Sequence, residues 1–148
     1  MTFRRAARCI SAAIIALVAT GCGPGDDDAG RIHAILEQMT QALEQGDVGD
    51  FLEPIADDFI AAERSLDKSA LRLVVMRERL ARKSISVQRI NTRVEMLSGT
   101  RATAAFRAIA TGGSGWLPEE GRLWLIETGW RLDGNDWKLV SAHWKPVL

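Results

Sequence analysis

The chain has 148 residues, of which 47% are hydrophobic and 26% charged, so it can bury one core in a single domain plus a small extra segment. Its 19 basic and 19 acidic residues cancel; the first 21 residues hold three arginines and no acid, which leaves 19 − 3 = 16 basic against 19 acidic residues. A slightly acidic chain of this kind argues against a nucleic-acid partner, because phosphate binding needs clustered arginine and lysine.

Residues 1–22 are predicted to be a targeting segment outside the fold. A basic start precedes the apolar run Ile10–Ala19, which is short for a transmembrane helix. The run ends in Leu-Val-Ala-Thr-Gly-Cys, which resembles the lipobox of bacterial lipoproteins, with Ala19 at the position that is usually leucine. The resemblance implies acylation of Cys22 and attachment to a bilayer, and Gly23 in place of aspartate favours the outer membrane, facing the periplasm. The alternative is an ordinary cleaved signal peptide.

The first half of the remaining chain is predicted to form three helices after a flexible tether at 23–28, in which Asp28 is a candidate N-cap. The helices are expected at Ala29–Gln45, Val48–Phe59 and Asp67–Lys83. Apolar side chains at helical spacing give the first and third helices their inward faces: Ile32, Ile35, Leu36, Met39, Leu43, Leu71, Val74, Val75 and Leu80. The basic residues of the third helix are expected to form a solvated face, with anionic lipid or a partner protein as the alternative.

Period-two alternation then predicts four antiparallel strands. The first, Ser84–Leu97, changes phase near Gln88-Arg89, which indicates a β-bulge. The second, Arg101–Thr111, places a row of alanines on one face, and such small side chains leave room for a deeply seated helix or a cavity. A glycine-rich loop follows, in which Trp116-Leu117 is a candidate lid or interface anchor.

The last two strands form a hairpin over Arg122–Lys145 with Gly134-Asn135 as its two-residue turn. The predicted register pairs Leu132 with Trp137, Trp130 with Leu139, Thr128 with Ser141, Ile126 with His143, and Trp124 with Lys145. These residues share the dry inner face. The outer face carries four large apolar groups, which are Leu123, Leu125, Val140 and Trp144.

This α+β order resembles the nuclear transport factor 2-like superfamily, a cone-shaped fold that includes ketosteroid isomerases, scytalone dehydratases, limonene epoxide hydrolases and polyketide cyclases. The residues that carry the resemblance are Gly46-Asp47 leading into Phe51-Leu52, then Ala56–Phe59, and the closing strand Gly134–Trp144. It covers about residues 29–146. The resemblance implies three N-terminal helices packed on a curved antiparallel sheet in a domain spanning 29–148.

The resemblance also implies a pocket between the inner sheet face and the helices. Its expected ligand-binding walls are Phe106, Trp124, Ile126, Thr128, Trp130, Leu139, Ser141 and His143, with Leu71 and Val75 opposite. His143 is the only titratable residue in that set and could act as a general base or acid. Of the superfamily's chemistries only a dehydratase-like pair survives, with His143 beside Asp57 or Asp58, because the chain has no tyrosine and the strand carboxylates fall outside. The alternative is a structural histidine bonded to one of these aspartates or to water.

Three functions follow from these residues. The first is a non-catalytic lipoprotein domain that binds a small apolar molecule or has a filled core. The second, compatible with it, is an interaction domain whose outer sheet face forms a homodimer or docks an envelope protein. The third is a small hydrolase, isomerase or dehydratase that uses His143. The chain has no CxxC, HExxH or phosphate-binding glycine pattern, so no metal and no cofactor are expected.

Overall fold

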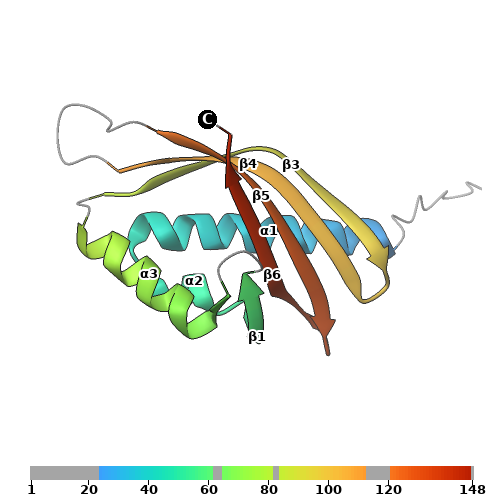
Figure 1. Ribbon diagram of the computed structural model, residues 1–148. Helices are drawn as coiled ribbons and strands as arrows, with labels where there is room; N and C mark the ends of the chain where they lie inside the picture. Colours follow the sequence, from blue (N-terminus) through green and yellow to red (C-terminus); the bar gives the residue numbers. More distant parts are fainter. Residues whose placement is uncertain (1–23, 62–64, 82–83, 113–120, 148) are drawn as a thin grey trace, which may run out of the picture.

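A computed structural model (Figure 1) describes residues 24–61, 65–81, 84–112 and 121–147. One six-stranded sheet has the strand order β2-β1-β6-β5-β4-β3, and α1 runs across one of its faces. The elements are α1 Pro24–Gln45, α2 Val48–Leu52, β1 Ile55–Ala61, β2 Leu66–Asp67, α3 Lys68–Ala81, β3 Ser86–Ser98, β4 Arg101–Thr111, β5 Arg122–Asp133 and β6 Asp136–Pro146. The predicted α+β class, with helices against a curved sheet, is confirmed. The predicted targeting segment and the Trp116-Leu117 loop lie outside the described residues.

Helix α1 supplies one wall of the core through the predicted stripe. Ile32, Leu36 and Met39 are buried against the sheet. The helix begins at Pro24, so the predicted tether is helical from that residue, and Asp28 lies inside the helix rather than capping it. Proline fits the first helical position and acids are favourable in the first turn. The Asp28 carboxylate accepts a hydrogen bond from the Trp137 indole at 3.0 Å, which joins α1 to β6.

The predicted second helix is half wrong. Helix α2 ends at Leu52, and after Pro54 the chain continues as strand β1. This strand runs parallel to β6, where Ile55 lies opposite Leu139 and Ile60 opposite Ser141. Its buried positions are irregularly spaced, so they fit a helical pattern as well as an alternating one. The sheet is therefore mixed and six-stranded, not the predicted four-stranded antiparallel sheet.

The closing hairpin has the predicted turn, but its predicted register is wrong beyond Leu139. Leu132 pairs with Trp137 and Trp130 with Leu139, as predicted, and Gly134 has a positive φ of 62°. Gly129 then pairs with Ser141, so Val140 is an extra residue in β6. A Cβ on Gly129 would lie 2.4 Å from the Ser141 hydroxyl oxygen, so the glycine gives the bulge its room. Every β6 side chain after the bulge changes face relative to the prediction.

A second bulge lies three residues from its predicted place. Met96 pairs with Ala102 and Val94 with Ala104. The register changes between Ile90 and Arg93, where Asn91 has a positive φ of 55°. Asparagine tolerates this left-handed conformation better than most residues. The shift turns Arg89 toward the inner face and leaves Ile90 exposed.

Helix α3 is less deeply packed than predicted. Val75 is buried and Leu71 is half-buried, as expected. Val74 and Leu80 are exposed, contrary to the prediction. Asp67 caps the helix, since its carboxylate accepts a hydrogen bond from the Ala70 amide at 2.7 Å. The helix contacts β1, β2 and α2 at one end of the molecule (Figure 1).

Candidate functional site

The predicted pocket wall is divided between the two faces of the sheet. Phe106, Thr128, Trp130 and Leu139 are buried in the core, and Trp124 and Ile126 are half-buried on the same inner face. The two remaining wall residues, Ser141 and His143, are opposite Gly129 and Glu127 on the outer face. The cause is the bulge at Val140, which reverses the side-chain alternation of β6.

The structure places the predicted catalytic residues away from the inner face. Asp57 and Asp58 are consecutive on β1, and both side chains are exposed. Their partners are basic side chains: Lys68 lies 2.9 Å from Asp57, and Arg131 lies 2.8 Å from Asp58. None of the three predicted catalytic side chains, His143 included, therefore lies on the inner face.

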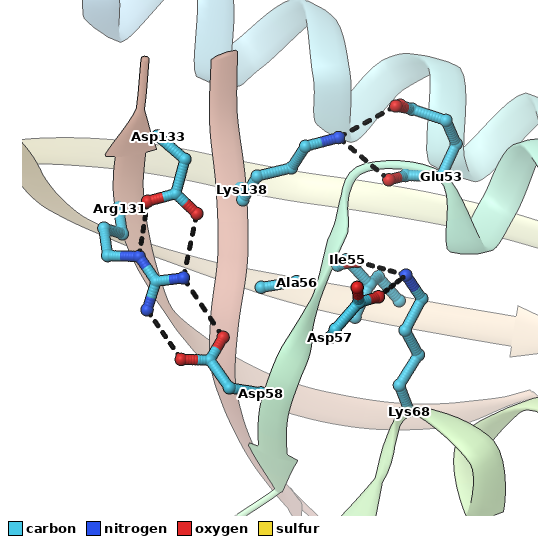
Figure 2. A pocket seen from close by; sticks show the side chains of 9 residues that line it. All are labelled: Glu53, Ile55, Ala56, Asp57, Asp58, Lys68, Arg131, Asp133 and Lys138. Atoms are coloured by element: carbon cyan, nitrogen blue, oxygen red, sulfur yellow. Dashed lines mark hydrogen bonds and ion pairs between the residues drawn. The ribbon is translucent and has the colours of Figure 1, made fainter. Parts of the chain in front are cut away.

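The two aspartates line an open groove of about 430 Å³ beside β1, shown in Figure 2. Three basic side chains form ion pairs with carboxylates that line this groove. Besides the pairs above, Arg131 binds Asp133 at 2.6 Å and Lys138 binds Glu53 at 2.8 Å. Lys68 and Lys138 also donate to the backbone carbonyl oxygens of Ile55 and Glu53. The groove is lined by Glu53, Ile55, Ala56, Asp57, Asp58, Lys68, Arg131, Asp133 and Lys138.

The contacts of Arg131 favour the ionised forms of Asp58 and Asp133. Hydrogen bonds from Arg131 lower the pKa of Asp58 and of Asp133 below the usual range for a carboxyl group. The same bonds, with that to Asp133 first, raise the pKa of Arg131. A general base is most effective when its pKa lies near the working pH, and these groups move away from it. The geometry fits a clamp in which Arg131 joins β5 to β1 and Lys138 joins β6 to Glu53, just before β1.

Thr128 and Trp130 form a hydrogen-bonded polar pair on the inner face. The Trp130 indole donates to the Thr128 hydroxyl at 2.9 Å, and that hydroxyl donates to the Ala104 carbonyl oxygen at 3.0 Å. Among the residues that the structure describes, Thr128 is the one polar residue that is buried. The sequence predicted both residues as wall positions but not this bond. Methyl groups and aromatic rings form the surrounding surface.

Arg89 is an inner-face residue that the sequence reasoning missed. Its side chain is 12% exposed, and its guanidinium lies 2.6 Å from the Glu37 carboxylate of α1. Its Cζ is 5.9 Å from the centre of the Phe106 ring. The hydrogen bond from Arg89 lowers the pKa of Glu37. The Nη1 atom is buried without a hydrogen-bond partner. Asn91 is the sequence signal that could have located this arginine. Asparagine is suited to a β-bulge, and a bulge at Asn91 turns Arg89 toward the inner face.

Among the described residues, no group of three or more histidine, cysteine, aspartate or glutamate side chains could hold a metal ion. Within the same ranges, no helix is long and apolar enough to cross a membrane.

Solved structures share this architecture. A protein of unknown function described as nuclear transport factor 2-like, from Pseudomonas putida KT2440, is 20% identical, with a TM-score of 0.70 over 81% of this chain and 87% of that one. The domain has a nuclear transport factor 2-like, cystatin-like fold. A candidate dehydratase of that family from Streptomyces avermitilis is 19% identical, with a TM-score of 0.71 over 84% of this chain and 99% of that one.

A third structure with this nuclear transport factor 2-like fold is a hexachlorocyclohexane dehydrochlorinase from Novosphingobium barchaimii LL02. It is 11% identical, with a TM-score of 0.68 over 84% of this chain and 90% of that one. No protein-family model and no curated protein sequence matches the chain. Identities this low establish the fold, which hosts both binding proteins and enzymes, so the activity must be argued from the side chains of this domain.

Proposed function

We propose that this chain is a lipid-anchored protein of the bacterial cell envelope whose nuclear transport factor 2-like domain binds a small, largely apolar molecule without transforming it. The observation that carries the proposal is the Trp130–Thr128–Ala104 chain of hydrogen bonds. It leaves the inner face around these residues as an apolar surface, with the Arg89 guanidinium as a charged group beside Phe106.

The composition of β4 supports a ligand rather than a reaction. Ala102, Ala104 and Ala108 line its inner face and are all buried. Small side chains fill less space than the leucines or phenylalanines that usually occupy such positions, so they can accommodate a guest. Arg89 lies beside Phe106 with one buried donor available, which suits a ligand that carries a single anionic or carbonyl oxygen.

The anchor rests on the N-terminal sequence alone. A basic start, a short apolar run and the Ala19–Cys22 stretch fit export followed by acylation of Cys22. The Cys22→Ser variant tests this part separately. We expect the wild-type chain to gain the mass of its acyl groups and to fractionate with membranes, and the variant to lose both. An unmodified wild-type chain would contradict the anchor and leave the binding proposal intact.

The binding part is tested by extracting small molecules from protein purified from its own host. We expect wild type to yield a compound that the Ala104→Leu variant lacks, because the larger side chain fills inner-face space. Ala105→Leu, on the neighbouring outer-face position of β4, is the matched control and should retain the compound. Equal extracts from wild type and Ala104→Leu would contradict the proposal.

An elimination enzyme is the second candidate, because two of the structural neighbours are a candidate dehydratase and a dehydrochlorinase. In this chain it would require His143 to act from the outer face, where it lies opposite Glu127. Unchanged turnover of the extracted compound class by His143→Ala would rule out that role.

A further inference from the structure

Helix α3 carries an apolar stripe on the side that faces away from the domain. Leu73, Met76 and Leu80 recur at the spacing of one helix face, and their side chains are 67%, 41% and 88% exposed. Val75, on the opposite face, is the core contact and is 9% exposed. Two exposed leucines and a methionine in one row are unusual on a helix whose other side already packs on the domain.

Basic side chains flank this stripe. At 3.6 residues per turn, Arg72 lies about 40° from Met76 on one side and Arg77 about 40° from Leu73 on the other. Both arginines are exposed. Glu78 is the single acidic residue of the helix. A third arginine, Arg79, packs against Gly46 and belongs to the domain side. The outward face is thus an apolar stripe with an arginine on each edge. The chain after residue 21 is, as a whole, slightly acidic.

We propose that α3 lies in the interface of an anionic lipid bilayer, with Leu73, Met76 and Leu80 at the level of the acyl chains and Arg72 and Arg77 on lipid phosphates. Amphipathic helices of this composition bind bilayers through buried apolar area together with attraction to anionic headgroups. The 14 residues of α3 span about 21 Å. A helix of this length is too short to cross a bilayer, so it would lie along the membrane surface.

The charges favour lipid over a second copy of the chain. Packing stripe to stripe would bring Arg72 and Arg77 of one copy close to the same residues of the other, with Glu78 as the one acid that α3 could offer. Lipid phosphates supply the missing negative partner. The inference goes beyond the proposed ligand binding and does not require acylation of Cys22, although an anchor would raise the local concentration of bilayer around α3.

Hydrogen exchange of the full chain tests this inference. Protein purified in mild detergent is reconstituted into vesicles of phosphatidylcholine alone, or of equal parts phosphatidylcholine and phosphatidylglycerol. We expect exchange in the Lys68–Ala81 peptide to slow about tenfold or more in the anionic vesicles only. Peptides from the β3–β4 hairpin should exchange equally in both.

Two double variants separate the contributions. Leu73→Ser with Leu80→Ser should abolish the slowing in anionic vesicles. Arg72→Gln with Arg77→Gln should weaken binding about 30-fold and remove its dependence on phosphatidylglycerol. Leu97→Ser is the matched control, because Leu97 is a 60% exposed leucine on the β3–β4 hairpin and should change nothing. All five positions are exposed, so these variants should keep the wild-type melting temperature.

Three outcomes would overturn the inference. One is equal α3 exchange in both vesicle compositions. Another is protection already present in detergent together with cross-links between α3 helices, which would identify a second copy as the occupant. The third is protection in detergent that disappears when the apolar run Ile10–Ala19 is made polar, which would identify the chain's own N-terminal segment. A Cys22→Ser change alters only the anchor, so failure of the anchor and failure of this inference give different results.

Discussion

The Thr128→Val variant tests whether the Thr128 hydroxyl bonds both the Trp130 indole and the Ala104 carbonyl oxygen on the inner face. Valine has nearly the same shape as threonine but can neither accept from the Trp130 indole nor donate to the Ala104 carbonyl oxygen. Both hydrogen bonds, of 2.9 and 3.0 Å, would be lost in a place where Thr128 is 5% exposed and Trp130 1% exposed. A buried donor without a partner costs about 1–3 kcal/mol. For a domain of this size that corresponds to a fall in Tm of about 3–15 °C.

The assay is urea unfolding followed by tryptophan fluorescence. Thr128→Ser keeps the hydroxyl and should lose only about 1 kcal/mol for the missing methyl group. Thr103→Val changes an exposed threonine of the neighbouring strand β4 and should stay within about 0.5 kcal/mol of wild type. If Thr128→Val also stayed within about 0.5 kcal/mol, the hydrogen-bond chain would not be present as described, and the argument for an unreactive inner face would fail.

Further variants test other parts of the domain. Gly46→Ala should cost about 1–2 kcal/mol in urea unfolding, because Gly46 has φ +81° at the end of α1; an unchanged midpoint would contradict that conformation. The lowered pKa values of Asp58 and Asp133 mean that their stabilisation is present above the unfolded carboxyl pKa, about 3.9, and is lost as pH falls through the folded values. Arg131→Met should therefore flatten the dependence of Tm on pH below about pH 4, and a steeper slope would refute the clamp. His143→Ala should leave ligand retention unchanged.

Local signals in the sequence were sufficient for α1 and for the turn of the closing hairpin. The helical spacing of Ile32, Leu36 and Met39 can be recognised without knowledge of the tertiary structure. Gly134-Asn135 favours a tight turn through its backbone conformation alone. The fold class followed from these elements in order.

The candidate site could not be predicted in the same way, because it depends on one extra residue. The Val140 bulge is set by the fit of Gly129 against Ser141 on a neighbouring strand, and nothing in the local pattern of β6 marks it. Since side chains alternate, that single residue moved His143 to the outer face and Trp144 to the inner face, where Trp144 packs against the core. The predicted inner-face position of His143 and the predicted outer-face position of Trp144 were therefore both wrong.

Strand β1 shows how tertiary context overrides a local pattern. Ile55, Phe59 and Ala61 pack in the core from a strand that lies parallel to β6, and parallel pairing brings together residues far apart in sequence. Read alone, the same residues fit the face of a helix. Arg89 was missed for a related reason, since its direction depends on the bulge at Asn91.

Native mass spectrometry of the intact protein, purified from its host in mild detergent, tests the central claim most directly. The account predicts one small-molecule adduct per chain, whose mass is the same before and after prolonged incubation and which is absent from Ala104→Leu. An adduct whose mass changes during incubation would show that the domain transforms its ligand. Bare wild-type protein, with no adduct under conditions that preserve the fold, would show that the inner face is a filled core.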